Sequence, residues 1–269
     1  MTRTAPLPCV LSIAGSDSGS AAGIQADLKT FAAFGVHGLT AITAITAQNT
    51  RTIAAVRVLS PQILLAQLDA VRADFRIAAV KIGMLGSAAN VRAVAHWLRM
   101  HRLKNIVVDP VLAASSGNRL LTPAALTALR GELIPLAEVL TPNVPEAEAL
   151  LGRPIRTAAD VRTAVQELQR LGARAVLLKG GHLDTASVRD YLAEEDGIAE
   201  FTHRRRNFSA RGTGCTLASA IAAGLALGLS PHAAIQRAER YLQRAFRDAR
   251  KIGRGAARIL HHAASSECD

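Results

Sequence analysis

The feature of this sequence that most constrains its fold is a regular alternation of short apolar runs with longer segments of helical periodicity. The runs expected to form strands are residues 9–15, 39–46, 78–83, 105–110, 138–143 and 174–179. Helices are expected at residues 24–34, 61–75, 91–100, 123–133, 161–171, 216–227 and 231–249, and a hairpin at 188–203. Strands that alternate with helices predict an α/β fold with three layers, α/β/α, around a central and mostly parallel sheet.

Length and composition agree with one compact unit. With 269 residues, 49% of them hydrophobic, we expect a single domain over residues 1–269, with a loose tail after about residue 250. The sequence contains no run of eighteen apolar residues, so no membrane span is expected, and its apolar N-terminal segment is too short for a secretory signal. The three cysteines form no Cys-x-x-Cys pair, which argues against a disulfide framework and a zinc site and for a cytoplasmic protein.

The net charge of +11 raises the question of nucleic-acid binding. The basic residues are spread along the chain, and aromatic residues, which would stack on single strands, make up only 3% of it. The one dense basic run, residues 204–206, is expected to be a solvated hairpin or loop, and a patch facing a phosphate is the alternative. We therefore expect no nucleic-acid partner, and the basic surface also suits small anionic substrates.

Polar or glycine-rich residues follow five of the expected strands. These strand ends carry Gln48, Asp109, Asn143, Lys179 and the loop at Gly212. In open α/β sheets, ligands bind at the carboxyl ends of the strands. The sequence therefore predicts one ligand site built from these five segments.

The most informative of these segments is Arg-Gly-Thr-Gly-Cys-Thr at residues 211–216, which runs into a helix rich in small residues. The first amides of a helix have no internal partner and carry partial positive charge, and glycines let an anion approach them closely. Gly212, Thr213, Gly214 and Cys215 are thus candidates for binding a phosphate group. A helix N-terminus also lowers the pKa of a cysteine, so we expect a reactive Cys215; a buried, inert cysteine beside a simple tight turn is the alternative.

The sequence has neither the P-loop nor the Gly-x-Gly-x-x-Gly dinucleotide motif. Eight other motifs resemble, in the same order, the hydroxymethylpyrimidine/phosphomethylpyrimidine kinases of thiamin biosynthesis, which belong to the ribokinase superfamily. They are Ala-Gly-Ser-Asp-Ser at 14–18, Ala-Gly-Ile-Gln-Ala-Asp at 22–27, Ala-Gln-Asn-Thr at 47–50, Lys-Ile-Gly-Met-Leu at 81–85, Asp-Pro-Val at 109–111, Thr-Pro-Asn at 141–143, Lys-Gly-Gly-His at 179–182 and Gly-Thr-Gly-Cys at 212–215.

The resemblance implies a ribokinase-like fold and two phosphorylations by ATP. The substrates would be 4-amino-5-hydroxymethyl-2-methylpyrimidine and then its monophosphate, with Mg²⁺ as cofactor and a homodimer as the common assembly. Gln48 matches the residue that reads the aminopyrimidine, because an amide offers the complementary acceptor and donors. The other residues that match the substrate pocket of the family are Gly15, Ala22, Asp27, Met84 and Val111.

The same resemblance assigns the phosphate end of the site. Asn143 and Lys179 match residues near the nucleotide phosphates, and Asp109 and Glu146 would hold Mg²⁺. Cys215 takes the position of the catalytic base, and residues 212–214 would bind the transferred phosphoryl group. Without the family resemblance, the local sequence also explains Glu146 as a carboxylate in the first turn of a helix. It likewise explains Asp27 as an aspartate early in a helix that complements the helix dipole.

Three positions depart from the usual pattern of the family: Ser20-Ala21 replaces two glycines, Arg211 replaces a histidine, and Ser115 replaces a lysine or threonine. They leave the substrate range open. A vitamin B6 kinase shares the Gly-Thr-Gly-Cys motif and is the nearest alternative, with Gln48 as the discriminating residue. A non-catalytic pyrimidine or nucleotide sensor is a further alternative, against which the presence of Asp109, Glu146, Lys179 and Cys215 argues.

Overall fold

One nine-stranded sheet forms the centre of the computed structural model, which describes residues 6–112, 122–180 and 187–263. The strand order is β3-β2-β1-β4-β5-β6-β7-β8-β9, and the strands from β2 to β7 run parallel. β3, which pairs with β2, and β8, which pairs with β7, are antiparallel to their neighbours. The strands are β1 Cys9–Asp17, β2 His37–Gln48, β3 Ile53–Val58, β4 Ile77–Ile82, β5 Ile106–Val108, β6 Val139–Leu140, β7 Ala175–Leu178, β8 Ser187–Glu194 and β9 Gly197–Arg204.

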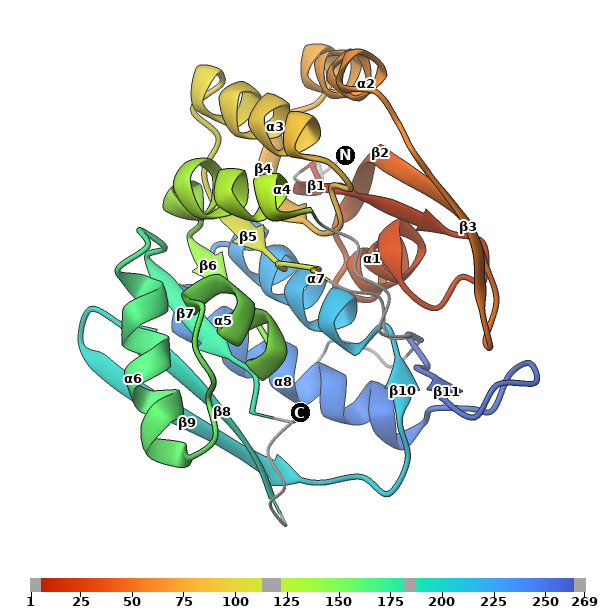
Figure 1. The fold of residues 1–269 in the computed structure, drawn as a ribbon. Coiled ribbons are helices and arrows are strands. Elements are labelled where there is room, and N and C mark those ends of the chain that lie inside the picture. The colour runs from red at the N-terminus through yellow and green to blue at the C-terminus, as the bar shows by residue number, and fades with distance from the viewer. Residues whose placement is uncertain (1–5, 113–121, 181–186, 264–269) are drawn as a thin grey trace, which may run out of the picture.

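Helices cover both faces of this sheet (Figure 1). They are α1 Gly23–Ala33, α2 Pro61–Asp74, α3 Ala88–Met100, α4 Pro123–Ala128, α5 Val144–Leu151, α6 Ala158–Gln169, α7 Thr213–Ala226 and α8 Pro231–Arg247. A π-turn at Leu129–Leu133 and a 3₁₀ turn at Ile134–Leu136 continue α4. Within the described ranges, no helix has both the length and the apolar character that a membrane span requires.

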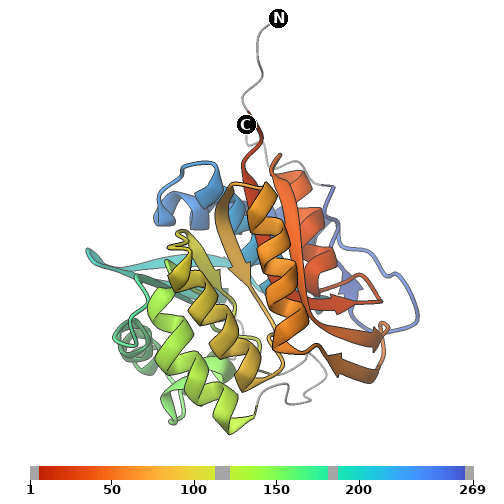
Figure 2. The same cartoon turned by 90° about the horizontal axis from the view of Figure 1, so that it is seen from above.

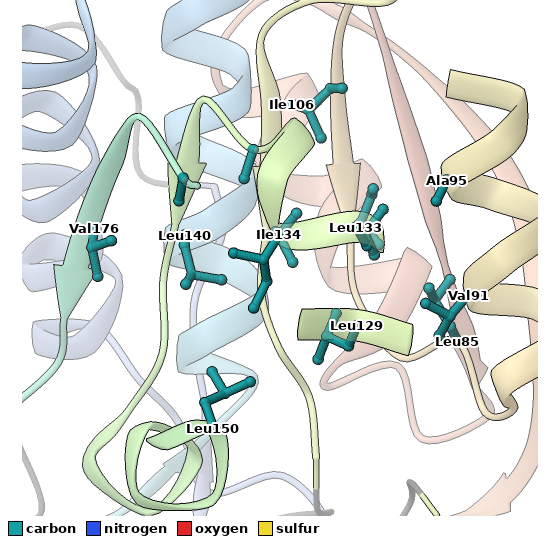
Figure 3. Packing of buried hydrophobic residues seen from close by; sticks show 14 of the residues in the cluster. Leu85, Val91, Ala95, Ile106, Leu129, Leu133, Ile134, Leu140, Leu150 and Val176 are labelled. Atoms are coloured by element: carbon teal, nitrogen blue, oxygen red, sulfur yellow. The ribbon is translucent and has the colours of Figure 1, made fainter. Parts of the chain in front are cut away.

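The two faces of the sheet belong to separate hydrophobic clusters. Along β1, Leu11 and Ile13 point into one cluster and Val10 into the other, as expected for a strand that is buried on both faces. The first cluster packs against α2, α3, α4, α5 and α6, and Figure 2 shows α2, α3 and α4 together on that side of the sheet. Its centre, around Leu133, Ile134 and Leu140, is shown in Figure 3. The second cluster packs against α1, α7 and α8.

The helix starts follow from local sequence. Asn143 and Glu146 form a capping box at α5, and Thr157 and Asp160 form another at α6. Proline occupies the first turn of α2, α4, α5 and α8, where its missing N–H has no helical partner to lose. The predicted order of strands and helices is confirmed.

Two parts of the chain differ from the prediction. Strand β3 has no counterpart among the expected strands, because five of its six residues are exposed and it therefore lacks an alternating apolar pattern. In the tail expected to be loose, the part around residues 258–262 packs against the rest of the chain, whereas residues 250–254 are exposed. Strand β11, Arg258–Ile259, pairs in parallel with β10, Ala210–Arg211, and Leu260 and His262 are buried. Ser115, Gly181, His182 and the last six residues lie outside the described residues.

Candidate active site

A cleft of about 1460 Å³ lies at the carboxyl ends of the parallel strands. All of the residues predicted for the site except Asp27 line it. They are Gly15, Ala22, Gln48, Met84, Asp109, Val111, Asn143, Glu146, Lys179, Gly212, Thr213, Gly214 and Cys215. The five polar strand ends therefore meet in one place, because parallel strands bring their carboxyl ends to the same edge of the sheet.

Helix α7 directs its N-terminus into this cleft. Gly212 is its N-cap residue with φ of 77°, and the first intrahelical bond is donated by the Thr216 amide to the Gly212 carbonyl at 2.8 Å. The amides of Thr213, Gly214 and Cys215 precede that bond, and no side chain caps them. They remain available to an anion in the cleft, as the sequence predicts.

The Cys215 thiol lies at this helix N-terminus and is half-buried. Burial raises the pKa of Cys215 to about 11; Lys81 lowers it, Asp27 and Asp109 raise it, and a hydrogen bond from the Gly23 amide lowers it. The expectation of a lowered pKa at this helix end is therefore wrong. The thiol is protonated at neutral pH, with its sulfur still in the cleft.

Asp109 and Lys179 form an ion pair beside the first turn of α7. The Lys179 Nζ is 3.2 Å from Asp109 Oδ1, and the Asp109 side chain is almost completely buried. Gly214 packs directly against both groups, so that a Cβ at this position would stand 3.3 Å from Lys179 Nζ and 3.4 Å from Asp109 Oδ2. Burial lowers the pKa of Lys179, but Asp109 and Glu146 more than offset it, and the net pKa is raised. Lys179 is therefore a fixed positive charge next to the unpaired amides.

Asn143 and Glu146 have a double role. The Glu146 Oε2 accepts from the Asn143 amide at 2.9 Å, and Asn143 Oδ1 accepts from the Glu146 amide at 2.9 Å, which caps α5. Burial raises the pKa of Glu146 to about 7; Lys179 opposes this rise and Asp109 adds to it. The capping explanation of Glu146 is thus correct, and its carboxylate also lines the cleft.

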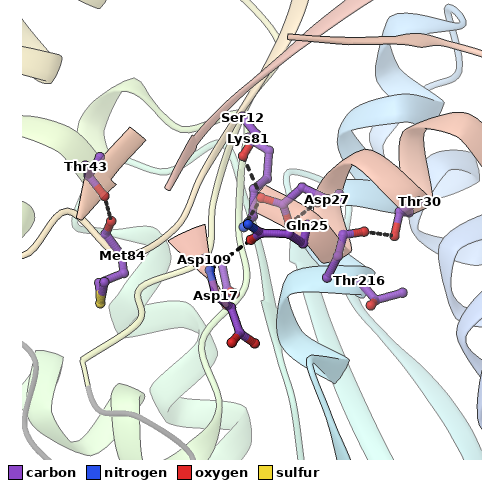
Figure 4. Close-up of polar contacts among 12 residues, drawn as sticks. Ser12, Asp17, Gln25, Asp27, Thr30, Thr43, Lys81, Met84, Asp109 and Thr216 are labelled. Carbon is purple, nitrogen blue, oxygen red and sulfur yellow. Dashed lines mark hydrogen bonds and ion pairs between the residues drawn. The ribbon is translucent and has the colours of Figure 1, made fainter. Parts of the chain in front are cut away.

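Asp27 is fully buried and does not line the cleft, which corrects its assignment to the substrate pocket. Its Oδ2 accepts from Ser12 Oγ at 2.5 Å and pairs with Lys81 Nζ at 2.9 Å, and its Oδ1 accepts from Ser219 Oγ at 2.7 Å (Figure 4). Burial lowers the pKa of Lys81, but the Asp27 carboxylate and its neighbours produce a net rise. The Lys81 ammonium is therefore kept charged beside the Asp27 carboxyl group.

Sequence reasoning gave no role to Lys81 and Asp17, both of which line the cleft. The signal for Lys81 is a lysine inside an apolar strand, which requires a buried counter-ion. Asp17 organises the following loop, because its carboxylate accepts from the amides of Gly19, Ala21 and Ala22 at 2.8, 3.1 and 2.9 Å. An aspartate that accepts hydrogen bonds from backbone amides a few residues later is typical of such turns.

Gln48, Met84 and Val111 also line the cleft. Ser18 Oγ donates to the Gln48 carbonyl at 2.7 Å and accepts from its amide at 2.8 Å, which fixes the backbone of Gln48. Within the described chain, no hydrogen bond is present at the Gln48 side-chain amide, so its donors and acceptor can serve a ligand. Gly15 packs tightly against Met84, since a Cβ there would stand 2.6 Å from Met84 Cε.

The basic run at residues 204–206 also lines the cleft, beyond Lys179. Arg204 at the end of β9 and Arg206 in the following loop are exposed, as expected for a solvated hairpin or loop, and their place in the cleft lining also agrees with the phosphate-facing alternative. Arg211 lines the cleft too, and its Nη1 donates to the Asn49 carbonyl at 2.7 Å. The cleft thus combines cationic side chains, bare helix amides and one free amide side chain. This arrangement suits transfer of a phosphoryl group between two ligands.

Comparisons with known proteins also indicate a phosphoryl-transfer enzyme. The sequence matches the family model described as phosphomethylpyrimidine kinase over residues 17–259. It is 48% identical to the hydroxymethylpyrimidine/phosphomethylpyrimidine kinase of Rhizobium meliloti, over 93% of this chain and 96% of that protein. It is 45% identical to the thiamine biosynthesis bifunctional protein ThiED of Geobacter sulfurreducens over 98% of this chain, and the match spans 55% of that longer protein.

The fold is also similar to that of solved vitamin kinase structures. The ADP complex of Bacillus subtilis pyridoxal kinase superposes with a TM-score of 0.89 at 32% sequence identity, covering 96% of this chain and 98% of that one. The predicted ribokinase-like α/β fold is therefore confirmed.

Proposed function

Because the chain belongs to the phosphomethylpyrimidine kinase family, we propose that it transfers the γ-phosphoryl group of ATP first to 4-amino-5-hydroxymethyl-2-methylpyrimidine and then to its monophosphate. The observation that carries this proposal is that the uncapped α7 amides, the Asp109–Lys179 pair and Gln48 line the same cleft. A phosphoryl group at these amides would have the Lys179 ammonium beside it, and the acceptor substrate would bind in the same cleft.

Each of these groups has a separate role in the proposed phosphoryl transfer. The amides of residues 213–215 stabilise the charge that spreads over the transferred group, and Lys179 neutralises the phosphates of the nucleotide. Gln48 orients the aminopyrimidine through its amide, so that the hydroxymethyl oxygen lies near Cys215. In its thiolate form, Cys215 accepts the proton of that hydroxyl group as the phosphoryl group transfers.

The carboxylates of Asp109 and Glu146 fit Mg²⁺ as the cofactor. Oxygen ligands suit this hard cation, and a positive charge between the two carboxylates would oppose the effect by which Asp109 raises the pKa of Glu146. When bound, Mg²⁺ neutralises charge on the transferring phosphates. Asn143 keeps Glu146 in position through the α5 capping box.

The experiment that tests the function compares three acceptors in parallel. Consumption of ATP is measured with the aminopyrimidine alcohol, with its monophosphate and with pyridoxal, all in the presence of Mg²⁺. We expect turnover with both pyrimidines and a kcat/KM for them at least tenfold above that for pyridoxal, because the Gln48 amide complements the aminopyrimidine edge. Turnover with pyridoxal alone would overturn the proposal.

A pyridoxal kinase remains the second candidate because of the structural similarity to the Bacillus subtilis enzyme. Its identity of 32% is lower than the 48% to the Rhizobium meliloti kinase, which favours the pyrimidine. Substitution of Gln48 by Ala separates the two, since it removes the proposed pyrimidine contact and should reduce kcat/KM for the pyrimidine more than for pyridoxal.

We also propose that the chain forms a homodimer through the β2–β3 ribbon. Strand β3 is one edge of the sheet (Figure 1), so one side of its backbone is open to further pairing. Exposed apolar side chains flank this edge on both faces of the ribbon: Ile45, 52% exposed, lies on the face of its partner Arg57, and Val56 and Val58, 42% and 36% exposed, lie on the other face. A second copy paired along this edge would lie next to both faces, and Val56 also lines the cleft, so the interface would adjoin the active site.

A further inference from the structure

Three ionisable side chains meet beside the cleft without a role in the proposed reaction. Asp190 on β8, His203 on β9 and Glu239 on α8 each place a possible ligand atom within 4.8 Å of the others. Val188 is paired with His203 and Asp190 with Phe201, so that Asp190 and His203 project from the same face of the hairpin. Helix α8 brings Glu239 to that face.

The contacts within this cluster leave it unsatisfied. His203 Nε2 is 3.7 Å from Asp190 Oδ2 and His203 Nδ1 is 3.9 Å from Glu239 Oε2, both too long for hydrogen bonds. Asp190 Oδ1 accepts from the Gly180 amide at 2.7 Å, while Oδ2 is directed toward His203. In the part of the chain that the structure describes, neither oxygen of Glu239 has a hydrogen bond of normal geometry, and the Asp190 carboxyl group is the neighbour with which Glu239 could share a proton.

Glu239 gives the strongest indication of a bound cation in this cluster, because its side chain is buried, with only 6% of the residue exposed. Burying a carboxylate without a partner is costly, and the site can remove this cost by taking up either a proton or a cation. Burial raises the pKa of Glu239 well above its usual range, and the Asp190 carboxylate adds to this rise. Burial also raises the pKa of Asp190, which His203 and Lys179 oppose. Lys179, the neighbouring ammonium, is already paired with Asp109.

The chemistry of the three groups indicates which cation would bind. Two carboxylates and one imidazole suit a divalent first-row transition metal, whereas Mg²⁺ prefers oxygen ligands alone. Metal–ligand bonds of about 2.0–2.2 Å place two tetrahedral ligand atoms roughly 3.4 Å apart. The ligand atoms of this cluster are between 3.7 Å and 4.8 Å apart, so each pair has to approach by a distance of between about 0.3 Å and about 1.4 Å to bind a metal ion. Asp190 and His203 line the cleft, which leaves a further coordination position open to water or to a phosphate oxygen.

We propose that Asp190, His203 and Glu239 form a binding site for a divalent transition-metal ion such as Zn²⁺, separate from the Asp109–Glu146 pair. The ion joins the β8–β9 hairpin to α8. Because Asp190 also holds the amide of Gly180, the residue after Lys179, metal binding fixes the strand end that carries the phosphate-binding lysine. This site does not depend on the identity of the kinase substrate.

The test uses the full chain after treatment with EDTA. Co²⁺ is the spectroscopic probe and Zn²⁺ the calorimetric one, each titrated in the presence of excess Mg²⁺. We expect one equivalent to bind, with the visible absorption of a low-symmetry Co²⁺ site, and Zn²⁺ to raise the melting temperature. Glu239→Gln and His203→Ala should each weaken binding by at least tenfold and abolish the shift in melting temperature.

Glu239→Gln is expected to fold, because it replaces an unpaired buried carboxylate with a neutral group of the same shape. The matched control is His232→Ala, since His232 also pairs with a glutamate, its Nδ1 lying 2.9 Å from Glu194 Oε2, but at an exposed position. This variant should bind Co²⁺ as the unmodified chain does. Absence of binding in the unmodified chain, or equal affinity in Glu239→Gln, would overturn the proposal and leave a proton-sharing carboxyl pair as the role of the cluster.

Discussion

Cys215 experiences two opposing effects. The unpaired amides of α7 favour the thiolate, and a charge at a helix terminus is worth about 0.3–1 kcal/mol. Burial favours the thiol, and the rise in pKa from 9.0 to about 11 corresponds to roughly 3 kcal/mol. Burial is therefore the larger effect, so only a small fraction of Cys215 is thiolate near neutral pH, and that fraction grows as the pH rises.

For Cys215→Ala we expect kcat to fall by about 100-fold with little change in either KM, because the proton acceptor is lost and the binding groups remain. Between pH 8 and 9.5 the logarithm of kcat should rise with pH in the unmodified enzyme, since a pKa near 11 leaves little thiolate at lower pH. That rise should be absent in the variant. Steady-state kinetics over this range, with circular dichroism as a check on folding, measure both effects; near-normal turnover would remove Cys215 from the role of base.

The raised pKa of Glu146 leads us to expect a second pH dependence, that of Mg²⁺ affinity, at lower pH than the effect of Cys215. With a pKa of about 7, its carboxyl group is mostly protonated at pH 6 and mostly ionised at pH 8, so the affinity for Mg²⁺ should decrease as the pH falls through 7. Titration of turnover with Mg²⁺ at pH 6 and 8 should show a several-fold weaker apparent affinity at pH 6. In Glu146→Gln this difference should largely disappear, and an unchanged difference would exclude Glu146 as its source.

At the scale of elements, α7 is held in place by two kinds of contact. Asp27 on α1 connects to Ser12 on β1, Lys81 on β4 and Ser219 on α7, so one buried carboxylate joins four elements. At the start of α7, Gly212 lies so close to the Ala21 carbonyl oxygen that a Cβ would overlap with it. Its φ of 77° is also unfavourable for any residue with a side chain.

Gly212→Ala should therefore displace the first turn of α7. We expect kcat/KM to fall at least tenfold and the free energy of unfolding to fall by about 1–3 kcal/mol, because both the backbone conformation and the close approach are lost. The control is Gly228→Ala, just beyond the other end of the same helix. Gly228 also has a positive φ, of 86°, but no atom lies within 4 Å of the added Cβ. Urea unfolding and kinetics should show a loss of stability alone in the control; a full loss of activity there would contradict this explanation.

At the scale of the whole molecule, the β2–β3 ribbon forms one edge of the sheet and leaves apolar side chains exposed on β3 and at Ile45. We expect a dimer by light scattering coupled to size exclusion, and Ile45→Asp should shift it toward monomer, because a charge would be buried at the interface. Met100→Asp is the control, since Met100 is 67% exposed at the end of α3, away from the ribbon. A dimer that is insensitive to Ile45→Asp would place the interface elsewhere.

Much of this organisation follows directly from the sequence. The alternation of apolar runs and helical segments fixes a parallel sheet, and the polar strand ends at Gln48, Asp109, Asn143 and Lys179 then have to share one cleft. Glycines at residues 212 and 214 likewise predict the bare helix N-terminus. These features are local or follow from the direction of the strands, so they do not require knowledge of which side chains touch.

Other features were decided by the tertiary structure alone. The pKa of Cys215 depends on how deeply its neighbours bury it, Asp27 is held away from the cleft by a lysine 54 residues away, and residues 258–259 pair with β10. The cluster of Asp190, His203 and Glu239 joins a hairpin to a distant helix. The sequence by itself thus determined the fold, the cleft and its main residues, whereas burial and long-range charge, which exist only once the chain is packed, determined the protonation and partners of those residues.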